Sequence, residues 1–238
     1  MTTNRIITFA NQKGGVGKTT LCTLFAEYLS ARNEPVRILD CDLQQTIFSK
    51  RNEDVRKYPG NTMPFEVQPV EIAIPQNVKI LMDSIKDSKE HTGCVLIDAP
   101  GNLSQQGLVP LFAMSDYLVC PFQFESSSIN STATFIGFIL KLKKMIPQMH
   151  TQMVFVVNKW MKTYGKKTEW ELWNKTEDHL RHFGLVAPRI EQKADIQRYN
   201  TMEMMQPVAD IVGPSFEVIY NHIFRLLLSG KTFSNKIN

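Results

Sequence analysis

The stretch NQKGGVGKTT, residues 11–20, constrains this chain more than any other part of the sequence. An apolar run at residues 6–10 precedes it, and a helical pattern from about residue 17 to residue 32 follows it. A strand, a glycine loop and a helix in this order turn backbone N–H groups inward and add the positive end of the helix dipole. Both features favour a bound phosphate. In such a loop Lys18 would reach the β- and γ-phosphates, and the Thr19 hydroxyl would hold Mg²⁺.

The loop is a variant of the general P-loop pattern G-x-x-x-x-G-K-[ST]. Gln12 stands where that pattern has its first glycine, and Lys13 follows, which gives K-G-G-x-G-K-T-T. We expect Gly14, Gly15 and Gly17 to allow backbone angles and close approaches that a Cβ would block. A glycine-rich turn without a ligand is the alternative, but the strand, glycines, lysine, hydroxyl and helix all fall in register.

At these residues the sequence resembles the deviant Walker A ATPases, the group of ParA, MinD and the nitrogenase iron protein. The resemblance implies that Lys13 reaches across a dimer interface to the partner's ATP, so that ATP drives formation of a homodimer. It also implies a nucleotide site formed by the whole loop, which comprises Lys13, Gly14, Gly15, Val16, Gly17, Lys18, Thr19 and Thr20.

A second motif, DCDLQQT at residues 40–46, follows a short apolar-biased run that we predict to be a strand. Open parallel sheets bind ligands at the carboxyl edge, so both acids of this motif should face the γ-phosphate region. The corresponding ParA pattern is D-x-D-P-Q-x-[ST], and Leu43 replaces its proline here, which affects how stiffly the turn is held. By resemblance, Asp42 orients the attacking water and Asp40 supports the Mg²⁺ shell. Two solvated acids in a turn are the alternative.

A third acid ends the apolar strand predicted at residues 94–98, in the Walker B arrangement. Asp98 would bind Mg²⁺ through water at the same sheet edge. The family reads D-x-P-P at this point, whereas Gly101 takes the last position here, a change that could loosen the segment after Asp98.

Three later segments extend the resemblance over nearly the whole chain. Pro121, Gln123 and Glu125 match a P-x-Q-x-E segment that ParA proteins use beside the dimer interface. Asn158, at the end of a strand predicted at residues 152–157, resembles an adenine-contacting residue. Pro188 begins a Pro-Arg pair near which the family's backbone lines the adenine.

Two other segments leave alternatives open. Lysines and aromatic residues interleave in residues 159–167, which could bind nucleic acid or form a solvated loop with two anchoring aromatics, Trp160 and Tyr164. The apolar face at residues 214–229 could pack as a last core helix or seek a membrane. We favour core packing, because few basic residues flank the face.

The remaining pattern predicts one P-loop domain over residues 1–238, an α/β fold with a doubly wound, mostly parallel sheet and helices on both faces. We expect strands at 36–40, 65–70 (an edge, because of Pro69) and 117–121, with a last strand before Pro188, and helices at 46–58, 77–89, 126–144 and 168–183. Four scattered cysteines without C-x-x-C spacing indicate reduced core residues.

Charge and hydropathy limit the classes of function. No run of eighteen apolar residues or signal-peptide pattern is present, which favours a cytoplasmic protein. Residues 1–120 carry 12 Lys/Arg and 13 Asp/Glu, a net −1, whereas residues 121–238 carry 15 and 10, a net +5. This second half could form a polyanion-binding face or only solvated helix surfaces.

The resemblance therefore implies a Mg²⁺-dependent ATP hydrolase, with Lys13, Lys18 and Asp42 in catalytic roles, that acts as a dimerisation switch. By analogy it binds non-specific DNA, associates with the nucleoid when ATP-bound, responds to a ParB-like partner and segregates a plasmid, chromosome or mobile element. A MinD-like membrane-positioning ATPase and a metabolic enzyme such as a dethiobiotin synthetase are the rivals. An iron–sulfur relative is disfavoured, because Cys94 and Cys120 lack a glycine-rich context.

Overall fold

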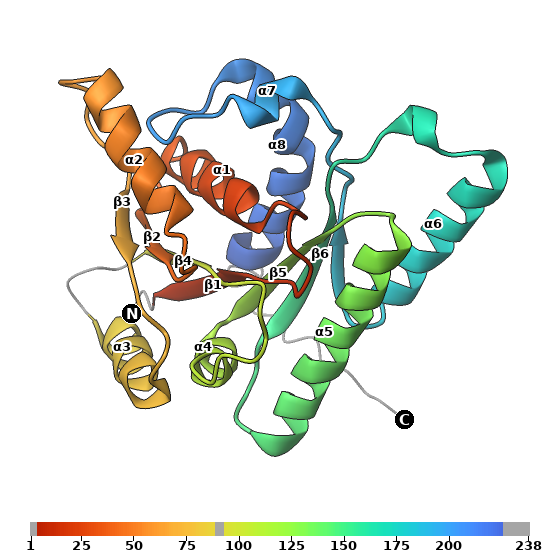
Figure 1. The fold of residues 1–238 in the computed structure, drawn as a ribbon, viewed down its shortest axis with the longest axis horizontal. Coiled ribbons are helices and arrows are strands. Elements are labelled where there is room, and N and C mark those ends of the chain that lie inside the picture. Colours follow the sequence, from red (N-terminus) through yellow and green to blue (C-terminus); the bar gives the residue numbers. More distant parts are fainter. Residues whose placement is uncertain (1–3, 89–92, 226–238) are drawn as a thin grey trace.

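A single parallel sheet organises the chain. The computed structural model describes residues 4–88 and 93–225, apart from the side chains of Tyr164 and Arg225. The strands are β1 Arg5–Phe9, β2 Val36–Asp40, β3 Glu66–Pro69, β4 Cys94–Asp98, β5 Tyr117–Phe122, β6 Gln152–Val157 and β7 Gly184–Ala187. They lie in the order β3-β2-β4-β1-β5-β6-β7 (Figure 1). The predicted doubly wound parallel fold is confirmed, and β3 is an edge strand, as Pro69 indicated.

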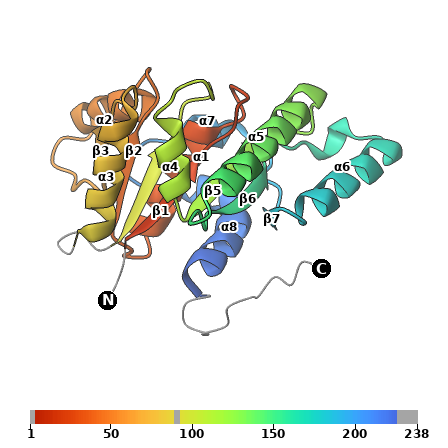
Figure 2. The same ribbon diagram turned by 90° about the horizontal axis from the view of Figure 1, so that it is seen from below.

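Helices cover both faces of the sheet. They are α1 Lys18–Ser30, α2 Thr46–Lys57, α3 Pro75–Asp87, α4 Leu108–Met114, α5 Ser126–Met145, α6 Lys167–Leu180, α7 Ala194–Gln197 and α8 Gln206–Tyr220. Helices α1, α7 and α8 lie on one face with α2 beside them, and α3, α4 and α5 lie on the other (Figures 1 and 2). Two buried apolar clusters, one on each side of the sheet, form the core.

The strand register brings two acids together. Asp40, the last residue of β2, pairs with Asp98, the last residue of β4, and Asp98 also pairs with Phe9 at the end of β1. Because these strands are parallel, the glycine loop after β1 and both acids meet at one edge of the sheet. This edge is where the sequence predicted a phosphate site.

The last helix differs from its predicted bounds. It begins at Gln206, eight residues before the predicted start, and Pro214 lies inside it. Pro207 in the first turn is the signal that marks this start, because a first-turn proline has no hydrogen bond to lose. The helix packs its apolar face into the core, where Phe216 meets Phe25 of α1 edge-on at 5.1 Å. Residues 226–229 of the prediction lie outside the described residues.

In the described part of the chain, no helix has the length and apolar character needed to cross a membrane. All four cysteines are buried with free thiols, as expected.

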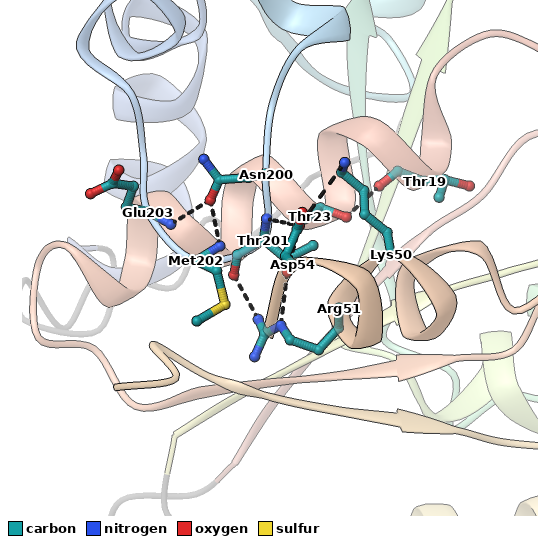
Figure 3. A network of polar contacts seen from close by, with 9 residues as sticks. All are labelled: Thr19, Thr23, Lys50, Arg51, Asp54, Asn200, Thr201, Met202 and Glu203. Atoms are coloured by element: carbon teal, nitrogen blue, oxygen red, sulfur yellow. Dashed lines mark hydrogen bonds and ion pairs between the residues drawn. The ribbon is translucent and has the colours of Figure 1, made fainter. Parts of the chain in front are cut away.

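A buried polar network fixes α2 to the loop before α8 (Figure 3). Arg51 of α2 is buried and donates from Nε to the Thr201 hydroxyl at 2.9 Å and from Nη2 to the Thr201 carbonyl at 2.8 Å. Its third nitrogen donates to the Phe65 carbonyl. Asp54, one turn along α2, accepts from the Thr201 N–H at 2.8 Å. These contacts tie α2 and the nearby Phe65 to Thr201, which lies 150 residues after Arg51 in the sequence.

We expect Arg51→Met to lower the free energy of unfolding by about 3 to 5 kcal/mol, because it leaves the buried acceptors on Thr201 and Phe65 unpaired and leaves Asp54 with Lys50 alone as a nearby cation. Urea unfolding followed by circular dichroism measures this change. Arg56→Met on the exposed side of the same helix is the control, with an expected effect within about 0.5 kcal/mol. Equal effects of the two substitutions would show that the network does not stabilise the fold.

Candidate functional site

The glycine loop has the backbone of a ligand cradle at two positions. Gly15 has φ 75° and Gly17 has φ 99°, both in the left-handed region. A Cβ at Gly17 would lie 2.2 Å from the Asn158 side-chain nitrogen and would displace that amide, and φ 99° by itself favours glycine. Gly17 also caps the N-terminus of α1, and its carbonyl accepts from Leu21 N at 2.9 Å. Gly14 shows neither a positive φ nor a close approach, so its predicted backbone requirement is absent from this conformation.

Side chains from the ends of β5 and β6 hold the outward carbonyls of the loop. Asn158 Nδ2 donates to the Val16 carbonyl at 2.8 Å. Lys159 Nζ donates to the Gly15 carbonyl at 2.7 Å, and Gln123 Nε2 donates to the same oxygen at 3.2 Å.

The start of the loop is held separately. Buried Asn11 donates to the Pro121 carbonyl at 2.8 Å and to the Thr132 hydroxyl at 3.0 Å, and its oxygen accepts from the Lys13 N–H. The loop therefore has side-chain support along its length.

Lys18 lies almost wholly buried in the first turn of α1. A Cβ at Gly101 would come 3.4 Å from its Nζ, so the lysine ammonium lies beside the loop that follows Asp98. The structure therefore brings the P-loop lysine and the Walker B segment together, as the motifs predicted. Gly101, noted from sequence as a departure, gives this ammonium room.

Asp98 is a buried carboxylate at the site with little compensation for its lost hydration. Its carboxylate is fully buried, and neither oxygen has a well-formed hydrogen bond. The pKa of Asp98 is raised to about 7, mainly by burial and also by the charge of Asp40, while the Thr19 hydroxyl and the Lys18 ammonium act in the opposite direction. A desolvated carboxylate with unused oxygens is a candidate to meet a cation.

The two carboxylate oxygens of Asp40 have different surroundings. One oxygen accepts from the N–H groups of Ile47 at 2.9 Å and Phe48 at 3.0 Å, at the start of α2. The other oxygen is buried without a partner. Burial raises the pKa of Asp40, and the backbone N–H groups of Phe48, Ile47 and Asp42 offset part of that shift. Asp40 therefore fastens α2 while it keeps one oxygen free beside Asp98.

Asp42 lies at the more open end of the turn. It is half-exposed, and its Oδ1 accepts from Gln44 N at 2.9 Å. Leu43, the residue in place of the family's proline, is 81% exposed. Gln45 has φ 45°, in the left-handed region, and is the N-cap residue of α2. Asp42 is thus placed by a local turn, and its side chain remains accessible.

A pocket with a volume of about 280 Å³ opens over the loop. From the predicted site it includes Gly15, Gly17, Lys18, Thr19, Thr20 and Asn158. Its other wall was missed from sequence and comprises Lys159, Glu191, Gln192, Lys193, Ile196 and Gln197. Pro188 is exposed and lines a separate groove beside α6, three residues before this wall begins. Its contact with adenine therefore stays a prediction.

The aromatic residues after β6 are packed against one another. Trp160 meets Trp170 edge-on at 5.6 Å, and the Arg189 guanidinium lies 5.4 Å from the Trp160 ring centre. This arrangement favours the anchoring interpretation for Trp160, whereas the side chain of Tyr164 lies outside the described part. Lys162, Lys166 and Lys167 are exposed nearby.

Comparison with solved structures shows the same fold in other proteins. A chain of Borrelia burgdorferi described as a plasmid partition protein, bound to AMPPNP, has TM-score 0.73 and 20% identity, over 93% of this chain and 100% of that one. The pNOB8 ParA protein bound to nonspecific DNA has TM-score 0.63 and 17% identity, over 96% and 100% of the two chains. At these identities the likeness shows the fold.

Sequence comparison gives distant relatives and a family. An uncharacterised protein of Pseudomonas putida is 24% identical over 167 residues, which make up 58% of this chain and 63% of that protein. The chain thus spans less than two thirds of that relative's length. The CobQ/CobB/MinD/ParA nucleotide binding domain matches residues 7–211. With its glycine loop and buried acids at the edge of a parallel sheet, the chain belongs to the CobQ/CobB/MinD/ParA nucleotide-binding family.

Proposed function

We propose that this protein is a Mg²⁺-dependent ATP hydrolase that acts as an ATP-driven dimerisation switch, binds non-specific DNA and partitions a plasmid, chromosome or mobile element. The observation that carries the proposal is the meeting of the P-loop lysine, Lys18, with the partly unpartnered carboxylates of Asp40 and Asp98 at one sheet edge. Family membership supports nucleotide binding. The AMPPNP in the Borrelia structure supports an adenine nucleotide.

The residues present fit a magnesium ion. Three buried carboxylate oxygens, two on Asp98 and one on Asp40, lack hydrogen-bond partners, and the Thr19 hydroxyl lies beside Asp98. Among the described residues no cluster of three or more His, Cys, Asp or Glu could hold a metal by itself. This donor set suits Mg²⁺, which usually takes one or two carboxylates and completes its shell with water and phosphate oxygens. When bound, it would neutralise charge on the phosphates.

The chain's own residues then have separate tasks. The loop from Gly14 to Thr20 binds the phosphates through backbone N–H groups and through Lys18. Asp42, accessible at the open end of its turn, orients the attacking water. Lys13, at the front of the loop, completes the site of a second subunit. Positioning and charge neutralisation of this kind are the main needs of phosphoryl transfer.

DNA is the proposed partner of the ATP-bound dimer. The net charge of +5 on residues 121–238 and the DNA complex of the pNOB8 ParA protein support it. We also propose a ParB-like protein that stimulates hydrolysis, and a cytoplasmic location with nucleoid association in the ATP state.

A MinD-like role at a membrane needs a free C-terminal amphipathic face, and the described part of α8 packs that face into the core. A small-molecule ligase on this fold remains the other rival.

Asp98→Asn should change the pH dependence of stability. In EDTA and without nucleotide, folded Asp98 keeps its proton up to about pH 7, whereas the unfolded chain loses it near pH 4. As pH rises between these values, the free energy of unfolding of the wild type should fall, relative to that of the variant, by up to about 1.4 kcal/mol per pH unit. Above the folded pKa the difference should not change further. Denaturant unfolding across this range measures the difference. A pH-independent difference would contradict the buried, uncompensated carboxylate.

Lys18→Ala and Asp42→Ala should separate binding from hydrolysis. Loss of Lys18 should weaken ATP binding by about 100-fold or more, because a buried cation that contacts two phosphates is removed. Loss of Asp42 should preserve binding but slow phosphate release by at least about 100-fold. Equilibrium binding of labelled ATP and a phosphate assay give both values. The control is Asp83→Ala, an exposed acid on α3. Tight ATP binding by Lys18→Ala would refute the loop assignment.

The DNA role is tested by retention of the protein on plasmid DNA with ATP and Mg²⁺, with ADP and Mg²⁺, and without nucleotide. We expect retention only with ATP, with an apparent affinity that falls steeply as salt rises. Asp42→Ala should remain bound for longer than wild type. Absence of retention in every state would refute DNA binding. It would not bear on the ATPase proposal, which the phosphate assay tests separately.

A further inference from the structure

In the glycine loop, the direction of each backbone carbonyl determines the direction of the N–H group that follows it. A trans peptide is planar, so its C=O and N–H point in opposite directions. The Gly15 carbonyl therefore fixes the direction of the Val16 N–H, and the Val16 carbonyl fixes that of the Gly17 N–H. Any group that holds these carbonyls outward also holds the two N–H groups inward.

Three side chains outside the loop hold these two carbonyls. Lys159 and Gln123 both donate to the Gly15 oxygen, at 2.7 and 3.2 Å. Asn158 donates to the Val16 oxygen at 2.8 Å. All three donors follow the carboxyl ends of β5 and β6, which are fixed by parallel pairing between Tyr117–Phe122 and Gln152–Val157. The donors are thus anchored on a rigid part of the sheet.

The backbone of Lys159 is also unusual. Its φ is 54°, in the left-handed region that side chains rarely adopt, although it follows a strand directly. Among the described residues no carboxylate lies within ion-pair distance of its ammonium, so the carbonyl of Gly15 is its contact. A strained backbone that aims a cation at the phosphate loop, inside the nucleotide pocket, indicates a role in the site.

We propose that Lys159 is a positioning residue of the nucleotide site: together with Gln123 and Asn158, it holds the Gly15–Val16–Gly17 peptides with their N–H groups toward the phosphates before nucleotide arrives. The inference rests on the proposed nucleotide binding. It adds that the phosphate cradle is preorganised from β5 and β6. The strongest effect of losing this contact should fall on nucleotide affinity, because free loop peptides must then be ordered during binding.

Lys159→Gly separates this role from a purely structural one. Glycine accepts φ 54° without strain, so the variant should unfold in the absence of nucleotide at the wild-type temperature or above it. Its affinity for a fluorescent ATP analogue with Mg²⁺ should nevertheless fall about tenfold, because a charged hydrogen bond to the loop is lost. Lys159→Arg can still reach the Gly15 carbonyl and should stay within about threefold of wild type.

Asn33→Gly is the matched control, because Asn33 is exposed, has φ 59° and lies outside the pocket. It should leave nucleotide affinity unchanged. Wild-type affinity in Lys159→Gly would overturn the inference, and so would a parallel fall in affinity and unfolding temperature, which indicates a structural role. Absence of binding by the wild-type chain would instead overturn the nucleotide-binding proposal itself, so the two failures are distinguishable.

Discussion

Parallel pairing of β1, β2 and β4 is the constraint on which the site depends. It places the carboxyl ends of three strands side by side, so that a glycine loop and two aspartates, separated by up to about ninety residues in sequence, share one edge. Antiparallel pairing of any of these strands would send its acid or its glycine loop to the opposite edge. The apolar clusters on both faces stabilise the sheet. The residues at the carboxyl ends of the strands form the candidate site.

That arrangement concentrates negative charge where water is excluded. Asp98 and Asp40 both have raised pKa values because they are buried, and the carbonyls of the glycine loop take up donors from β5 and β6. In the proposed function a cation meets the unpaired carboxylates and a polyanion meets the N–H groups of the loop. A phosphate chain that carries Mg²⁺ supplies both, which is why stability, metal binding and nucleotide binding should be coupled here.

The motifs predicted much of this from sequence, because each is a local pattern. The loop, Asp98 and the edge position of β3 follow from spacing and from Pro69. The far wall of the pocket at residues 191–197 could not be predicted, since it depends on how a loop folds back over the sheet edge. The capping role of Asp40 and the reach of Lys159 to Gly15 are likewise tertiary contacts without a sequence signal. The start of α8 was missed although Pro207 marked it.

Calorimetric titration of the wild-type chain with ATP, in the presence of Mg²⁺ and again in EDTA, tests the central claim most directly. The account predicts saturable binding of one ATP per chain that weakens markedly when Mg²⁺ is removed, because Asp40 and Asp98 then face the phosphates without a cation between them. Absence of binding in both buffers, or equal affinity in both, would contradict a site built around those two carboxylates.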